Sequence, residues 1–313
     1  MTRTLPPIIL LEPLSLLGRE LLQVMEERDL VPDRVRFFHL GESEEHQVAE
    51  LRGAAELVPP FSGEELPSGD AVLVIAGTPS PGRREALERV LADDDSIAVL
   101  DMAGTGLIDG PVLAGPPATK LWPPRVTVAS PGAATVYGLA APLLDEGLEG
   151  VWAAVEVPAS ARGREGVEAM ARRATARLQG IPPAGEDGPA EAFDLAPAED
   201  GRSAAEIAAL LPDVASSTAE VLVGVFHGWT VHVGLRFSNP VTAGRILARW
   251  DAAGTITRDG AALRLSAVVE SDTIHTGPLA LSADGRQLAV TACADGLRVG
   301  GATTALEILP ALV

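Results

Sequence analysis

Few side chains of this chain have a type and a spacing that could perform chemistry. Its single cysteine, Cys293, could supply a thiolate nucleophile, but it stands in a strand-like run, which predicts a buried small residue. His227 and His232 could transfer protons, but histidines on a pair of strands more often pack or face solvent. The sequence therefore favours structural roles for all three and leaves a relocated proton-transfer role for either histidine as the alternative.

Neither acidic cluster of the chain has the pattern of a metal site. Glu44, Glu45 and His46 lack a further ligand at metal-binding spacing, and the run Asp93-Asp94-Asp95 predicts a solvated loop. A nucleophile elbow of the form G-x-S-x-G does not occur in the sequence. We therefore expect no metal ion and no esterase of that type.

Composition and charge exclude several classes of protein. Acidic residues outnumber basic ones 43 to 24, for a net charge of -19, and such a surface repels phosphate backbones and anionic lipid. No apolar run reaches the roughly 20 residues of a membrane-spanning helix. One cysteine cannot form an internal disulfide, which fits a reducing cytoplasm. We expect a cytoplasmic protein that binds neither nucleic acid nor membrane.

The first part of the chain alternates strands with helices. Continuous apolar runs predict buried strands, whereas apolar residues at helical spacing predict the connecting helices. The expected strands span 7–11, 34–40, 71–77, 96–102 and 125–129, and the expected helices span 14–29 and 83–92. This order predicts a Rossmann-like, doubly wound parallel sheet in residues 1–129, joined by a C-terminal helix within 300–313.

The pattern changes near Ser130, where a second domain, residues 130–299, is expected to begin. It is predicted to be an α+β dimerisation domain with a mostly antiparallel sheet. Ser203 and Glu206 have the spacing of a helix-capping box, and 181–191 predicts a Pro/Gly-rich acidic loop. The expected strands span 150–157, 220–226, 230–237, 262–269 and 287–292, and the expected helices span 164–179, a short segment that ends at Pro212, and 240–253.

The strands of the second domain predict a homodimer. They carry more apolar residues than the few neighbouring helices can cover on two faces, so one face requires a second copy. The residues in question are Val221, Val223, Val225, Phe226, Val231, Val233, Leu235, Leu263, Leu265, Val268 and Val269.

Three stretches of the chain resemble aspartate-semialdehyde dehydrogenase. Residues 1–27 resemble its opening strand, glycine-rich turn and helix, residues 128–144 resemble its active-site strand and helix, and residues 160–178 resemble its S-G-A-G loop and the helix that follows. Ser130-Pro131-Gly132-Ala133 and the run 162–166 (RGREG) are similar to a cysteine-less paralogue group of that family. The resemblance implies the fold of that family and, for an intact member, NADP-dependent chemistry at an aldehyde or acyl phosphate.

The resemblance also implies that the catalytic positions are degenerate. Ala133 stands at the position of the nucleophilic cysteine, and Trp229 at that of the proton-transferring histidine. The substrate-binding arginine falls at Leu222, and the substrate-orienting glutamine at Val157. None of these side chains can perform the implied step.

The implied cofactor loop has changed as well. Glu12 and Ser15 stand at the first two glycines of the loop, and only Gly18 is kept. Glycine lets the backbone approach a pyrophosphate, and a carboxylate beside one repels it. We expect no cofactor, and NADP only if the enzyme is active after all.

The sequence predicts a dehydrogenase homologue without the catalytic Cys and His, a non-catalytic dimeric protein with a binding or regulatory role. Its partners would be a second copy, a true dehydrogenase subunit or a small anionic metabolite. The residues expected around a remnant pocket are Ser130, Thr135, Ser160, Arg162 and His227. The alternative is an active NADP-dependent oxidoreductase that acts on aspartate semialdehyde or a related aldehyde or acyl phosphate in amino-acid biosynthesis.

Overall fold

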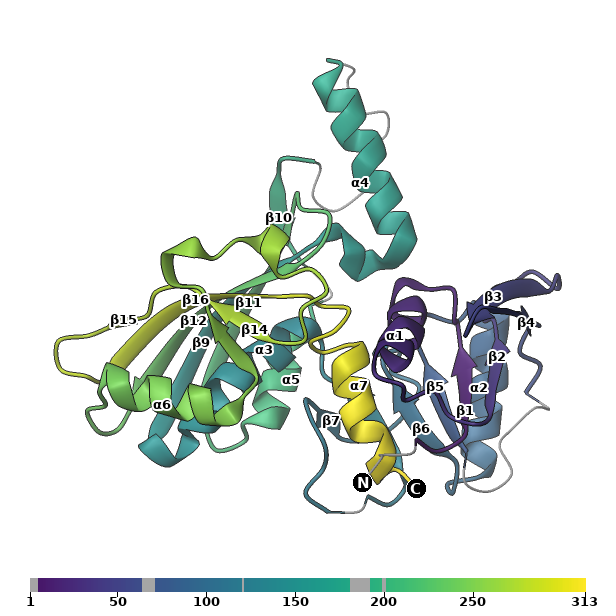
Figure 1. The fold of residues 1–313 in the computed structure, drawn as a ribbon, viewed down its shortest axis with the longest axis horizontal. Helices are drawn as coiled ribbons and strands as arrows, with labels where there is room; N and C mark the ends of the chain where they lie inside the picture. The colour runs from purple at the N-terminus through teal and green to yellow at the C-terminus, as the bar shows by residue number, and fades with distance from the viewer. Residues whose placement is uncertain (1–4, 64–70, 120, 181–191, 199–200) are drawn as a thin grey trace. The chain divides into compact units, whose positions relative to one another are not determined.

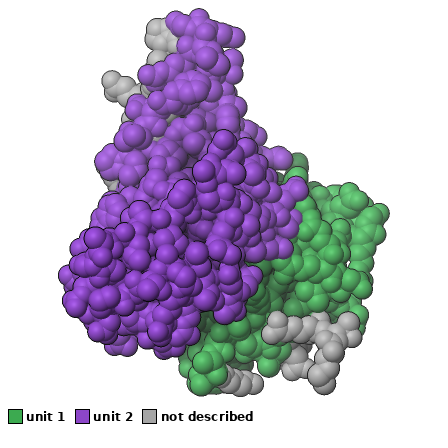
Figure 2. All heavy atoms as spheres, turned by 60° about the vertical axis from the view of Figure 1, so that its left-hand side comes forward, with its two compact units in different colours: residues 1–129, 300–313 green, residues 130–299 purple. Residues whose placement is uncertain are grey.

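A computed structural model describes residues 5–63, 71–119, 121–180, 192–198 and 201–313. The chain forms two compact units, residues 1–129 with 300–313 and residues 130–299, shown in green and purple in Figure 2. Among the described residues, no helix is long and apolar enough to cross a lipid bilayer. The predicted loop 181–191 lies outside the described residues.

Unit 1 is built on a six-stranded sheet in which every pairing is parallel. In spatial order its strands are β2 (Val35–Phe38), β1 (Ile8–Leu11), β5 (Val72–Ile75), β6 (Ala98–Asp101), β8 (Arg125–Val128) and β7 (Val112–Leu113). This confirms the Rossmann-like parallel sheet that the alternating pattern predicts. A hairpin that was not predicted, β3 (Gln47–Leu51) with β4 (Ala54–Val58), lies outside this sheet.

Both faces of this sheet are covered by helices (Figure 1). Ile8 and Leu10 point into a core shared with α1 (Leu16–Glu27), α7 (Ala302–Ile308) and the short helix η5 (Leu309–Ala311), whereas Ile9 and Leu11 point into a core shared with α2 (Pro81–Asp93). Successive side chains of a strand point to opposite faces, so a strand covered on both sides must be apolar throughout. This requirement explains the uninterrupted apolar runs in the sequence.

Unit 2 contains a mixed, mostly antiparallel sheet of eight strands. Only the pairs β11–β9 and β13–β14 are parallel. In spatial order the strands are β10 (Leu195–Pro197), β11 (Ala215–Val223), β9 (Leu148–Val157), β12 (Trp229–Phe237), β16 (Gln287–Ala294), β14 (Ile274–Thr276) and β13 (Ile256–Arg258), and β15 (Ala280–Leu281) pairs with β16. The fold class is therefore the predicted one.

The helices of unit 2 lie mainly on one face of its sheet (Figure 1). This face carries the large apolar side chains, such as Val231, Val233 and Leu235, which are buried. The opposite face carries mostly small and polar residues. The helical segments are α3 (Pro131–Ala140), η1 (Ala141–Glu146), η2 (Ala159–Arg162), α4 (Gly163–Leu178), α5 (Ser203–Leu210) and α6 (Ala243–Ala253).

Two sequence-based expectations in unit 2 are wrong. The segment 262–269 is not a strand, because it forms the short helical turns η3 (Gly260–Ala262) and η4 (Leu265–Ala267), and Leu265 packs against the backbone of Gly228. The capping box of Ser203 and Glu206 does not form either. Arg202 is the N-cap of α5 without a side-chain cap, and both expected capping residues bind elsewhere in the unit.

Candidate functional site

The topological switch point of unit 1 lies between β1 and β5. The chain leaves β1 towards β2 on one side and later returns to place β5 on the other. Ligands of doubly wound sheets bind outside the carboxyl ends of the two strands that flank such a point. The residues at these ends therefore decide whether a dinucleotide fits.

Glu12 follows β1 and adopts a left-handed conformation with φ of 63°. This conformation suits glycine, so the backbone has the shape of a glycine turn although a glutamate stands in it. The Glu12 carboxylate accepts a hydrogen bond from the backbone amide of Leu40, just beyond β2. A Cβ atom added at Gly77, which follows β5, would lie 2.8 Å from both Cβ and Cγ of Glu12. The Glu12 side chain therefore fills the position between the strand ends.

Ser15 and Gly18 pack the same turn. Ser15 is the N-cap of α1, where its Oγ accepts from the Gly18 amide at 2.9 Å and donates to the Ala76 carbonyl at 2.7 Å. A Cβ atom at Gly18 would lie 2.2 Å from the Glu12 carbonyl oxygen, so the one retained glycine is required for helix packing. The turn, with a carboxylate in it, does not fit a dinucleotide pyrophosphate.

The N-terminus of α3 in unit 2 is the implied position of the nucleophile. Ser130 caps this helix through an Oγ that accepts from the Ala133 amide at 3.4 Å, and Thr135 Oγ1 donates to the Pro131 carbonyl at 2.7 Å. Ala133 itself has no exposed surface. A methyl group at this place can neither attack a carbonyl carbon nor form a thioester.

Side chains of unit 2 itself close the space around this helix end. The Glu206 carboxylate accepts from the Ser130 amide at 2.8 Å and is paired with Arg202 at 3.2 Å. Ser203 Oγ lies 3.2 Å from Ser130 Oγ, and a Cβ atom at Gly132 would lie 2.9 Å from the same Ser203 oxygen. A carboxylate is stabilised at a helix N-terminus, so Glu206 occupies a position that suits a bound anion.

The other three positions that the resemblance predicts to be degenerate lie on the sheet. Leu222 of β11 pairs directly with Val157 of β9, so both belong to the strand ladder. Trp229 begins β12 and is buried, and a Cβ atom at Gly296 would lie 2.2 Å from its indole nitrogen. An indole packed in this way is a structural residue and cannot transfer protons.

A hydrogen-bonded array of Ser160, His227 and Asp295 lies in the same unit. His227 Nδ1 lies 2.9 Å from Ser160 Oγ, and His227 Nε2 lies 2.9 Å from Asp295 Oδ1. Ser160 lies in η2, His227 lies in the turn before β12, and Asp295 directly follows β16. Of the expected pocket residues, the structure thus joins Ser160 to His227. Ser130 is the N-cap of α3, Thr135 lies in α3, and Arg162 is the N-cap of α4.

Asp295 is the residue that the sequence analysis missed in this array. Besides His227, it accepts from the amides of Leu297 at 2.9 Å and Glu270 at 2.7 Å. Burial would raise the pKa of Asp295, but the hydrogen bond and charge of His227 and these two amides outweigh it, so the pKa lies below its usual range. An acidic residue directly after a β-rich run was the only signal in the sequence.

The remaining titratable candidates face the side of the sheet without helices. His232 Nδ1 lies 3.0 Å from Thr291 Oγ1, and His232 Nε2 lies 3.3 Å from Glu156. Cys293 in β16 is buried, as expected, and burial is the main cause of a raised pKa of its thiol. A raised thiol pKa lowers the thiolate fraction, so Cys293 is a poor nucleophile. No group of His, Cys, Asp and Glu in the described part of the chain could hold a metal ion.

The fold is that of aspartate-semialdehyde dehydrogenase. Aspartate semialdehyde dehydrogenase II from Vibrio cholerae, complexed with ASA, superposes with a TM-score of 0.82 over 99% of this chain and 98% of that chain, at 16% identity. A probable aspartate-semialdehyde dehydrogenase from Pseudomonas aeruginosa gives 0.82 over 97% of each chain at 21% identity. The enzyme from Francisella tularensis gives 0.75 over 96% of this chain and 97% of that chain at 15% identity. No protein-family model and no curated protein matches the sequence.

Proposed function

We propose that the chain is a cysteine-less homologue of aspartate-semialdehyde dehydrogenase that does not catalyse the dehydrogenase reaction. The observation that carries this proposal is Ala133, which is fully buried at the N-terminus of α3 where the nucleophile is expected. The chain's one thiol, Cys293, is buried in β16 and does not replace it. The covalent step of the reaction therefore lacks its nucleophile.

The occupied switch point of unit 1 supports the same proposal. The Glu12 side chain stands between the ends of β1 and β5, and its carboxylate is bound to the Leu40 amide. At about 5 Å and an effective dielectric near 20, a carboxylate opposes a phosphate charge by roughly 3 kcal/mol. Hydride transfer to or from NADP is therefore disfavoured independently of the missing thiol.

A binding role is the function that these units retain. Arg162, the N-cap of α4, carries a positive charge that suits a small anionic metabolite. A true dehydrogenase subunit is the other partner that we expect for such a homologue in the cytoplasm. A thermal-shift panel of nucleotides and aspartate-pathway intermediates separates a metabolite ligand from a purely protein partner.

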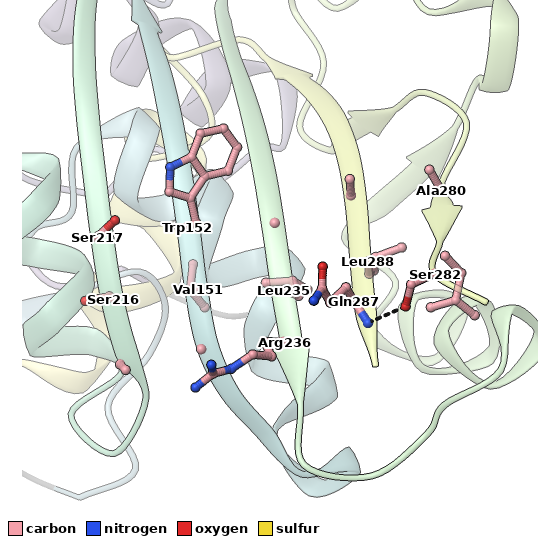
Figure 3. Close-up of a pocket in the computed structure, with 15 residues that line it drawn as sticks. Val151, Trp152, Ser216, Ser217, Leu235, Arg236, Ala280, Ser282, Gln287 and Leu288 are labelled. Carbon is pink, nitrogen blue, oxygen red and sulfur yellow. Dashed lines mark hydrogen bonds between the residues drawn. The ribbon is translucent and has the colours of Figure 1, made fainter. Parts of the chain in front are cut away.

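We also propose that the protein is a homodimer through the helix-free face of the unit 2 sheet. The apolar residues Val231, Val233 and Leu235 do not form the interface, because they are buried on the helix-covered face. The helix-free face instead holds an open hollow of about 730 Å³ with the indole of Trp152, 55% exposed, beside it (Figure 3). A hollowed face with an exposed tryptophan beside it suits packing with a second copy that fills the hollow.

The rival is an active NADP-dependent oxidoreductase with relocated catalytic residues. Purified protein incubated with NADP, aspartate semialdehyde and phosphate decides between the two, with an intact dehydrogenase as the positive control. We expect no formation of NADPH above the protein-free background. Turnover of NADP in step with consumption of the aldehyde would establish the rival instead.

A further inference from the structure

We propose that Ser160 is a nucleophile that His227 activates, and that this site transfers small acyl groups from activated esters. Ser160 Oγ and Asp295 Oδ1 each lie 2.9 Å from one of the two ring nitrogens of His227. A hydroxyl, an imidazole and a carboxylate in this order form the minimal unit of serine nucleophilic catalysis. The inference is independent of NADP and of the dehydrogenase reaction.

The array assigns the proton positions. An ionised Asp295 can only accept, so a neutral His227 carries its proton on Nε2 and directs it to the carboxylate. His227 Nδ1 is then the acceptor for the Ser160 hydroxyl proton. This is the tautomer that a general base needs when the serine oxygen attacks.

The carboxylate of the array is held more firmly than a surface ion pair. The Asp295 side chain is 3% exposed, against 22% for His227, and two backbone amides fix both of its oxygens. A buried, ionised carboxylate stabilises the imidazolium that forms when His227 takes a proton. Asp295 is therefore a positioning residue, and His227 is the group that water and small reagents can reach.

The surroundings of Ser160 limit the substrates. Ser160 lies in η2, which leads into the N-terminus of α4, where the partial positive charge of the helix favours a developing oxyanion. The amides of Ala159, Ser160 and Ala161, however, already donate to the carbonyls of Val225, Phe226 and Pro158. These amides cannot form an oxyanion hole, and Ser160 is only 8% exposed. The site thus suits small esters with good leaving groups, such as aryl esters.

Acyl transfer at Ser160 takes place in two stages. Ser160 Oγ forms a bond to the carbonyl carbon of the ester while its proton passes to His227 Nδ1. The bond from that carbon to the aryl oxygen breaks, and His227 gives its proton to the leaving phenolate. Water then attacks the acyl-serine with the same help from His227, which releases the carboxylic acid and restores Ser160.

A second array with the same residue types serves as a comparison. Ser271 Oγ lies 2.7 Å from His275 Nε2, and His275 Nδ1 lies 2.8 Å from Asp259. Ser271 Oγ, however, also accepts from the Thr273 amide at 3.3 Å and contacts Thr273 Oγ1 at 3.2 Å. The Asp259 side chain is 24% exposed, so its charge is more screened than that of Asp295. This serine closes a turn, and we assign no reactivity to it.

The test is covalent labelling of the full-length protein with a small fluorophosphonate, followed by intact mass and peptide mapping. We expect one label per chain, on Ser160, and release of nitrophenol from p-nitrophenyl acetate at a rate that Ser160→Ala abolishes. His227→Gln should slow both reactions by at least about a hundredfold, the scale of general-base catalysis. Ser271→Ala, the matched control, should leave both unchanged.

A purely structural role of the array predicts different results. It gives no label on Ser160 of the wild-type protein, or a labelling rate that His227→Gln does not change, and either outcome overturns the proposal. Label on Ser271 would overturn it as well. Asp295→Asn distinguishes positioning from folding, because a positioning role moves the pH midpoint of the labelling rate whereas a folding role lowers only the melting temperature. The labelled residue is mapped on the wild-type protein, so this part of the test does not depend on whether any variant folds.

Discussion

The Glu12 carboxylate accepts a hydrogen bond from the backbone amide of Leu40, across the carboxyl ends of β1 and β2. Glu12 does so from a left-handed backbone conformation with φ of 63°, which for a non-glycine residue costs on the order of 1 kcal/mol. The Leu40 contact offsets this cost. The turn therefore has a backbone shape that suits glycine but holds a negative charge.

Because of that charge, we expect NADP to bind more weakly than about 1 mM, the upper end of ordinary KM values. The double variant Glu12→Gly, Ser15→Gly removes both the charge and the bulk from the turn. Because it removes roughly 3 kcal/mol of repulsion, it should bind NADP about a hundredfold more tightly. Titration calorimetry measures both constants. Glu42→Gly, which removes an exposed carboxylate in the loop after β2, is the charge-matched control and should change nothing. A low-micromolar constant for the wild-type protein would contradict the prediction.

Ala133→Cys should not create dehydrogenase activity. Nucleophile, base and substrate clamp act as one unit, and Leu222 and Trp229 stay unsuited to their implied roles. The added sulfur must also enter a fully buried site, which typically costs 1–3 kcal/mol of stability. We expect a lower melting temperature and turnover of aspartate semialdehyde below about one per minute. Faster turnover would show that these positions are wrongly assigned.

The stability of the protein should depend on pH through Asp295. Its folded pKa is lowered, so its stabilising contribution is complete above the unfolded value near 3.8 and disappears as the pH falls through the lower folded value. We expect the urea concentration at the unfolding midpoint of unit 2 to decrease as the pH is lowered below about 4. This decrease should be less steep in Asp295→Asn. If the urea midpoints of the wild-type protein and of Asp295→Asn changed equally with pH, Asp295 would contribute nothing to the pH dependence of stability.

The proposed dimer can be tested at one tryptophan. Light scattering coupled to size exclusion should give a mass near twice the 32.3 kDa of the chain. Trp152→Glu places a charge in the helix-free face and should yield a monomer, since a buried unpaired charge opposes association. Trp122→Glu, at a tryptophan of unit 1 that is 75% exposed, is the control and should stay dimeric. A monomeric wild-type protein at micromolar concentration would refute the dimer.

Cys293 should resist thiol reagents in the folded protein. It is 4% exposed, and burial raises the pKa of its thiol. Dithionitrobenzoate should therefore react with about one thiol per chain in denaturant and with much less than one in its absence. Rapid reaction of the native protein would indicate that β16 opens locally.

The sequence determined the architecture because the apolar residues of each buried strand or helix recur at the spacing of that element. The runs at 71–77 and 96–102 are apolar throughout, as strands covered on both faces must be, and the structure places β5 and β6 there. The hairpin of β3 and β4 was missed because its strands are largely exposed and lack such a run. The segment 262–269 has apolar residues without a fixed period, and in the structure it forms short helical turns in which Leu265 packs against Gly228.

The degenerate positions stay a prediction of the resemblance, which places Ala133 and Trp229 at residues whose implied steps these side chains cannot perform. Only the tertiary structure decided which side chains surround these positions. Glu206 and Ser203 were predicted to cap their own helix, but they bind Ser130 and Glu220 instead, because a carboxylate gains more from a second, buried helix end. Asp295 and Ser160 are separated from His227 by more than sixty residues along the chain. The spacing of residues along the chain does not encode this contact, because the contact depends on which strand ends lie next to one another in the sheet.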